Sequence, residues 1–132
     1  MRKLPALLTL GALAFAGCGS GPSYVRDQDA TLRLTLDEYR LRPENITVRA
    51  GRVHLVARNV GRLTHNVAVE EWEPADEDAE PREYARTDTA HPGETVSERG
   101  ELRLKPGKYR ILCTIGNHDD LGQYGELKVT AK

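Results

Sequence analysis

Short runs of alternating apolar and polar residues dominate the chain from about residue 31 onward. Leucines occupy every second position of TLRLTL, residues 31–36, and NITVRAGRVHLVARNVG holds two more β-branched runs that meet at Ala50 and Gly51. Alternation with a period of two is typical of strands with one buried face, and no stretch has the longer period of an extended amphipathic helix. We therefore predict strands in this half of the chain.

The pattern continues toward the C-terminal end. HNVAVE, from His65 to Glu70, has its histidine and two valines on one face, and the runs YRILC and GELKVTA follow later in the chain. HPGE and KPGK each place proline and glycine where a type II turn favours them. About six to eight short strands separated by such turns predict an all-β fold, a Greek-key β-sandwich or barrel.

One segment breaks the alternation. Residues 70–86, EEWEPADEDAEPREYAR, are acidic and contain two prolines. Such a composition favours an exposed insertion, in which we expect a short helical turn near residues 75–79. We expect Trp72, the only tryptophan, to pack this segment against the domain.

The N-terminal residues have the features of an export signal. Residues 1–17 carry two positive charges and then a short apolar run, and they end beside Cys18. Cleavage after AFA would release a soluble protein. We favour the reading of FAGC as a bacterial lipobox, with Cys18 lipidated and residues 18–30 forming a flexible tether. The domain then covers residues 31–132.

Length and charge exclude several classes of protein. About 115 residues remain after the signal, enough for one domain, and we expect a monomer. The net charge is −1, and it becomes −3 when the two positive charges of the signal are removed. The chain has no basic region suited to nucleic acid, so no nucleic-acid partner is expected.

The cysteine usage directs attention to one loop. If Cys18 is acylated, Cys113 has no partner for a disulfide in an oxidising compartment, so it needs another role. Cys113 ends a predicted strand, His118 follows five residues later, and His65 begins an earlier strand. Two imidazoles and one thiolate, with a weak axial donor, are the ligands of a blue-copper centre. We expect His54 and His91 to be surface or structural residues.

The segments NVGRLTHNVAVE and YRILCTIGNHDDLGQYGELKV resemble the cupredoxins, the small blue-copper proteins. The resemblance extends over about residues 31–132 and implies a cupredoxin-like sandwich that binds one type 1 copper ion. The ligands that it implies are His65, Cys113, His118 and Gln123. Asn66 matches the asparagine that in such proteins joins the strand of the first histidine to the cysteine loop by hydrogen bonds.

Gln123 stands where most cupredoxins have methionine. Met1 is the only methionine of the chain and leaves with the signal, so no axial methionine is possible. A glutamine oxygen is an alternative axial donor, and the stellacyanin-like cupredoxins resemble this chain in having one. The harder oxygen favours Cu(II), so we expect a lower reduction potential than in a methionine-ligated relative.

These features predict a membrane-anchored electron carrier that cycles between Cu(II) and Cu(I). The alternative is a copper delivery or storage protein, a class that tends to use methionine clusters. An enzyme is not expected, because four histidines leave too few ligands for a second metal site. The predicted location is the bacterial cell envelope, on a membrane and facing the periplasm or the exterior. Asp119 and Asp120 beside His118 suggest redox partner proteins with a basic docking surface.

Overall fold

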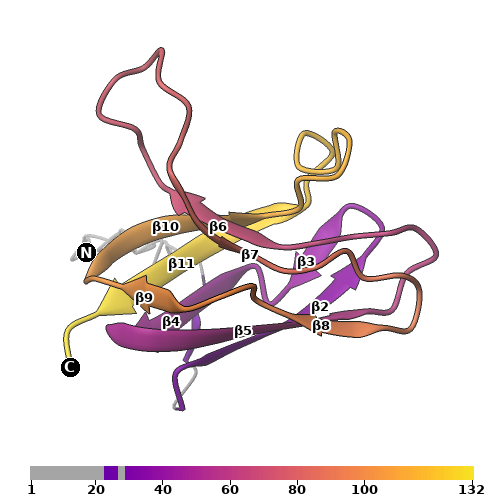
Figure 1. Ribbon diagram of the computed structural model, residues 1–132, viewed down its shortest axis with the longest axis horizontal. Helices are drawn as coiled ribbons and strands as arrows, with labels where there is room; N and C mark the ends of the chain where they lie inside the picture. Colours follow the sequence, from indigo (N-terminus) through magenta and orange to yellow (C-terminus); the bar gives the residue numbers. More distant parts are fainter. Residues whose placement is uncertain (1–22, 27–28) are drawn as a thin grey trace, which may run out of the picture.

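Two β-sheets pack face to face in the computed structural model of the protein (Figure 1). The structure describes residues 23–26 and 29–132. The predicted signal, residues 1–17, and the predicted lipidation site, Cys18, lie outside these residues. Within the described part of the chain, no helix has the length and apolar character needed to cross a bilayer.

The larger sheet has six strands and contains both parallel and antiparallel pairs. β4 and β11 are parallel neighbours, and β11, β10 and β6 are successive antiparallel neighbours. In spatial order its strands are β1 (Val25–Arg26), β4 (Asn45–Arg49), β11 (Tyr124–Thr130), β10 (Gly107–Leu112), β6 (Ala68–Glu71) and β7 (Glu83–Arg86).

The smaller sheet has five strands, and its central pair, β2 and β5, is parallel. β9 pairs with the beginning of β5, and β8 pairs with its second half. The strands are β3 (Arg40–Arg42), β2 (Thr31–Asp37), β5 (Gly51–Asn59), β8 (Thr95–Ser97) and β9 (Leu102–Leu104).

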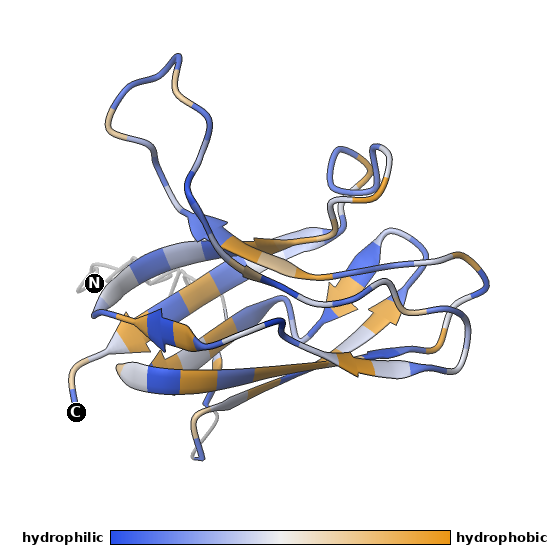
Figure 2. Ribbon diagram, in the orientation of Figure 1, coloured by the Kyte–Doolittle hydropathy of each residue, from blue (hydrophilic) through white to orange (hydrophobic). Residues whose placement is uncertain are grey.

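The core lies between the two sheets and is formed by the apolar faces that the alternation predicts. Figure 2 shows apolar and polar residues following one another along the strands. Leu32, Leu34 and Leu36 of β2 are buried, and they pack in one cluster with Ile111 of β10 and Leu127 of β11. Burying one such side chain fully contributes about 1.5–3 kcal/mol to folding. This core fixes the strand ends that carry the loops.

The all-β prediction is confirmed, and the structure adds detail to the predicted strands. The run at residues 31–36 belongs to β2, and Ala50 separates β4 from β5, which begins at Gly51 with a φ of 122°. The strand predicted for HNVAVE is shorter at its beginning, because β6 begins only at Ala68 and His65 forms an isolated bridge with Ala90. Eleven strands occur in the described residues, against about six to eight predicted, because strands of two or three residues are too short to show alternation.

The domain begins earlier than the expected boundary at residue 31. Val25 and Arg26, which we placed in a flexible tether, form β1 and pair in parallel with Ile46 and Thr47 of β4. The Tyr24 hydroxyl also donates a hydrogen bond to Glu126 of β11, at 2.5 Å. The described end of the expected tether is therefore part of the larger sheet.

The acidic segment forms a long excursion between β6 and β7 (Figure 1). Its two ends belong to these strands, so the irregular part is limited to residues 72–82, which we call the acidic loop. The expected helical turn is a single hydrogen-bonded turn, in which Ala79 N–H donates to the carbonyl of Asp76. Trp72 is half-exposed at the base of the loop, with the Lys108 ammonium 4.7 Å from the centre of its ring.

Candidate metal centre

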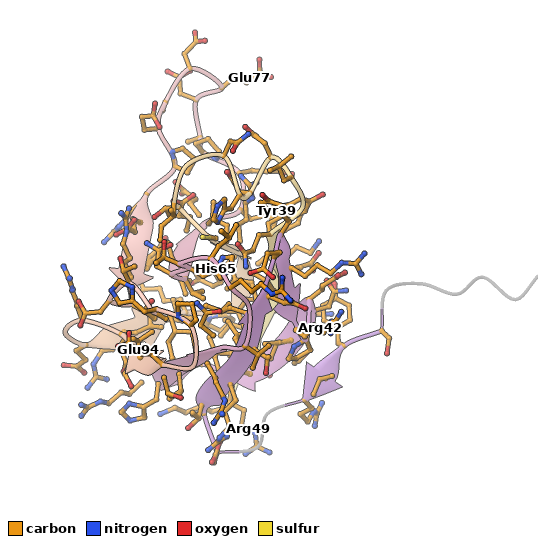
Figure 3. The ribbon with its side chains drawn as sticks, turned by 90° about the vertical axis from the view of Figure 1, so that its right-hand side faces the viewer. Tyr39, Arg42, Arg49, His65, Glu77 and Glu94 are labelled. Carbon is orange, nitrogen blue, oxygen red and sulfur yellow. The ribbon has the colours of Figure 1, made fainter. Side chains whose placement is uncertain are left out.

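The loops at one end of the sandwich bring the predicted ligands together. Figure 3 looks onto this end, where His65 lies near the middle of the view and Tyr39 lies above it. His65 comes from the segment between β5 and β6, and backbone hydrogen bonds in both directions pair it with Ala90, at 3.1 and 2.7 Å. Its side chain is fully buried. The bridge to Ala90 thus holds the backbone of His65 in place.

The other three predicted ligands lie on the connection between β10 and β11. Cys113 directly follows β10, and its N–H donates to the carbonyl of Gln123 at 3.0 Å. The N–H of Gln123 donates in turn to the carbonyl of His118, also at 3.0 Å. These two bonds close the base of the loop. Cys113 and Gln123 are buried, whereas His118 is partly exposed.

The spacing of the donor atoms fits one metal ion. One ligand atom from each of His65, Cys113 and His118 lies within 4.8 Å of the other two. Cys113 Sγ is 3.6 Å from His118 Nδ1. Thiolate and imidazole ligands about 2.3 and 2.0 Å from a shared tetrahedral ion would be separated by roughly 3.5 Å, close to the distance found here. The side chains are therefore already placed for coordination.

The Gln123 amide presents its oxygen to this group. Its Nε2 donates two hydrogen bonds, to the backbone carbonyls of Asp37 at 2.8 Å and Arg40 at 2.9 Å. Both amide hydrogens are used in these bonds, so the orientation of the amide is determined by its partners. Oε1 then lies 2.8 Å from Nδ1 of His65. A fourth donor atom, an oxygen, is thereby held beside the histidine.

Both ring nitrogens of His65 face oxygen acceptors. Nδ1 faces the Gln123 oxygen, and Nε2 lies 3.6 Å from the carboxylate of Glu38 without forming a hydrogen bond to any group in the described structure. A neutral imidazole has one N–H and can satisfy only one of these acceptors. A cation bound at Nδ1 leaves the proton on Nε2 and resolves the conflict. The lone pairs of His65 Nδ1 and of the Gln123 oxygen are therefore suited to binding a metal ion.

The turn that joins β2 to β3, residues 37–40, contacts three of the predicted ligands. Besides the two carbonyls bound by Gln123, it supplies Tyr39, whose ring meets the ring of His118 edge-on at 5.3 Å. Tyr39 has a φ of 58°, a left-handed conformation that is unfavourable for a bulky residue. Glu38 lies beside His65. We call residues 37–40 the ligand-support turn.

Glu38 also binds the backbone next to His65. Its Oε1 accepts hydrogen bonds from the N–H groups of Arg62 at 2.5 Å and Leu63 at 3.0 Å. The N–H groups of Leu63 and Arg62 stabilise the ionised carboxylate and lower the pKa of Glu38 to about 2. Sequence analysis missed Glu38 and Tyr39. The only sequence signal is a polar interruption, DEY, between two leucine-containing strands, and it does not reveal what those residues touch.

Asn66 joins the two ligand segments by side-chain hydrogen bonds. Its Nδ2 donates to Oγ1 of Thr114 at 2.9 Å, and its Oδ1 accepts the backbone N–H of Thr114 at 2.8 Å. Thr114 follows Cys113 and Asn66 follows His65, so these bonds hold two neighbouring ligands in register. They are the kind of contact that orients a ligand without touching the metal.

The remaining histidines lie apart from the group. His54 faces out and its Nδ1 lies 3.1 Å from Oε1 of Glu98, while His91 is exposed in its turn. Of the two acids after His118, Asp120 is exposed and Asp119 lies 3.7 Å from the guanidinium of Arg110. The acidic loop leaves β6 at the end opposite to His65, and Glu77 lies far from the centre in Figure 3.

Comparisons with known proteins identify the fold. No family model matches the chain, and no curated protein matches it. The structure is similar to dithionite-reduced auracyanin of the photosynthetic bacterium Roseiflexus castenholzii, with a TM-score of 0.65 and 19% identity over 79% of this chain and 99% of that one.

Two further auracyanin structures resemble the chain. Auracyanin A, a blue copper protein of Chloroflexus aurantiacus, has a TM-score of 0.62 and 21% identity, over 82% of this chain and 100% of its own. Auracyanin B has a TM-score of 0.62 and 19% identity, over 83% and 92%. At these identities the likeness shows a shared fold, and the predicted cupredoxin-like β-sandwich is confirmed.

Proposed function

We propose that the protein is an electron carrier with one type 1 copper ion, held by His65, Cys113, His118 and the side-chain oxygen of Gln123. The observation that carries the proposal is the convergence of a cysteine sulfur, two imidazoles and an oriented amide oxygen at one end of a cupredoxin-like sandwich. This donor set suits copper in both oxidation states. The similarity to auracyanins, one of them described as a blue copper protein, supports it.

A bound copper ion would supply a single reversible electron transfer, and the protein would keep its geometry constant. Cys113 and the two histidines offer soft and intermediate donors, while the Gln123 oxygen favours the oxidised ion. The strand bridge behind His65, the closed base of the loop and the bonds of Asn66 restrain all of them. Since little needs to move between the two states, the reorganisation cost is small.

Burial of the ligands favours a carrier over a copper delivery protein. His65, Cys113 and Gln123 have no exposed surface, and His118 alone among the four is partly open to solvent. A delivery protein must pass the ion itself to a partner, which requires accessible ligands. An electron needs only one exposed ligand edge, and His118 provides it. The proposal includes no catalytic acid or base and therefore no enzymatic reaction.

The location and the partner are parts of the same proposal. Residues 1–17 have the pattern of an export signal, and FAGC at residues 15–18 supports a lipid anchor at Cys18. The domain would then be tethered to a bacterial membrane, facing the periplasm or the exterior. Asp120 is exposed two residues after His118, which supports a redox partner with a basic surface.

The test is to add Cu(II) to the purified domain and record its visible spectrum and voltammogram. We expect an intense blue colour from thiolate-to-copper charge transfer, together with a reversible one-electron couple. Cys113→Ser should abolish the colour, and His54→Ala is the matched control that should leave it unchanged. A colourless wild-type complex would contradict the proposal.

A further inference from the structure

We propose that Glu38 is a positioning residue of the metal centre, whose carboxylate accepts the Nε2–H of His65 when Nδ1 binds the metal and thereby stabilises the oxidised ion. The inference rests on the proposed function for its redox consequence. The contact itself is independent of that function, because it requires only that His65 binds a cation through Nδ1.

Within the described structure, the Glu38 carboxylate lies close to an unpaired nitrogen of His65. His65 is buried, and its Nε2 is the one buried side-chain nitrogen or oxygen without a hydrogen-bond partner in the described residues. The charged atom that Nε2 faces is Oε1 of Glu38, at a distance of 3.6 Å. Leaving a buried imidazole N–H unpaired costs about 1–3 kcal/mol, so the carboxylate is the acceptor that the folded protein supplies.

Backbone hydrogen bonds hold Glu38 in place. The two backbone N–H groups of Arg62 and Leu63 bind Oε1, and the same short segment leads into His65. Gly61 makes the approach possible, because a Cβ on this residue would overlap the Glu38 carboxylate. The segment is held from the other side by Asn59, whose Nδ2 donates to the carbonyl of Leu63 at 2.7 Å.

A carboxylate that accepts a hydrogen bond from a metal-bound imidazole fixes the tautomer and orientation of the ring and increases its basicity as a ligand. A more basic imidazole that is hydrogen-bonded to a negative charge stabilises Cu(II) more than Cu(I). The charge of Glu38 therefore acts in the same direction as the oxygen of Gln123, and both residues are joined to the centre through the ligand-support turn.

The first measurement is the reduction potential of Glu38→Gln loaded with copper. The amide keeps the size of the side chain and an oxygen that can accept the N–H groups of residues 62 and 63, but it removes the charge. We expect the ratio of Cu(II) to Cu(I) affinity to fall about tenfold, which for a one-electron couple is a rise of about 59 mV. Gly61→Ala, which displaces the carboxylate, should shift the potential in the same direction.

Asp120→Asn is the matched control, because it removes an exposed negative charge at the same end of the molecule without touching His65. Its effect on the affinity ratio should stay below about threefold, since exposed charges are screened by solvent. A purely structural Glu38 would leave the potential of Glu38→Gln equal to that of this control, and that result would overturn the proposal.

A second measurement does not depend on redox activity. In the Zn(II)-loaded protein, nitrogen NMR of the imidazoles should show His65 protonated at Nε2, with a proton that exchanges more slowly in the wild type than in Glu38→Gln. If copper gives no blue centre but this result holds, the proposed function fails and the role of Glu38 stands. An unchanged Nε2 proton, or a His65 that binds neither ion, would refute the role of Glu38.

Discussion

Replacing Gln123 with methionine should change two properties in opposite directions. Methionine is the softer axial donor, so Gln123→Met should raise the reduction potential of the copper-loaded protein. The same substitution removes a side chain that also has a structural task in the metal-free protein. Its Nε2 donates to the carbonyls of Asp37 and Arg40, and its Oε1 lies within hydrogen-bond distance of His65.

The cost to stability follows from these contacts. Each net hydrogen bond contributes about 1 kcal/mol, and methionine can donate to neither carbonyl. The free energy of unfolding of metal-free Gln123→Met should therefore fall by about 2–3 kcal/mol, which for a domain of this size lowers Tm by roughly 10 °C. The contact with His65 contributes to the upper end of that range.

Urea denaturation of the metal-free proteins measures this loss, and voltammetry of the copper-loaded proteins measures the potential. Leu127→Met is the matched control, because Leu127 is equally buried but makes no side-chain hydrogen bond, and its cost should stay below about 1.5 kcal/mol. Equal stabilities for the two variants would refute the structural task of Gln123. An unchanged or lower potential would refute the axial oxygen.

Three other predictions concern the surroundings of the centre. Asn66→Ala should lower the free energy of unfolding of the metal-free protein by about 1–2 kcal/mol in urea, since two bonds to Thr114 are lost; an unaltered value would contradict their role. Tyr39→Ala should uncover His118 and speed the loss of copper to a chelator, followed by the decay of the blue colour, and an unchanged rate would count against shielding by the ring. Replacing residues 73–81 with an Asn-Gly turn should leave spectrum and potential as they were, because the acidic loop leaves the opposite end of β6; a shifted potential would show that the loop influences the centre.

The sequence was most informative where one face of a strand is buried. The leucines of β2 alternate because one face packs in the core, and the same rule identified β4 and β5. It failed for β1, a two-residue strand that depends on pairing with β4 and not on its own pattern. The rule also placed the start of β6 too early, since His65 is held by a bridge to a distant residue and not by a continuous ladder.

The site was predictable in its donors but not in their support. Cys113 and His118 share one short loop, so their proximity follows from the chain itself, and the one cysteine of the predicted domain drew attention to them. The support comes from a turn about eighty residues earlier in the chain, as the bonds from Gln123 to Asp37 and Arg40 show. Contacts between such distant segments depend on how the two sheets pack, and a single sequence carries no pattern for them.

The ligand-support turn belongs to the smaller sheet, and three of the proposed ligands lie on the β10–β11 connection of the larger one. The fourth, His65, comes from the segment that links β5 of the smaller sheet to β6 of the larger. Gln123 and Glu38 therefore connect the two sheets, the layers of the sandwich, at the end that is formed by loops and not by paired strands. An ion bound there would act as a cross-link between layers, and its free energy of binding would oppose their separation. The open end of the sandwich would then be the part of the fold that metal binding stabilises most.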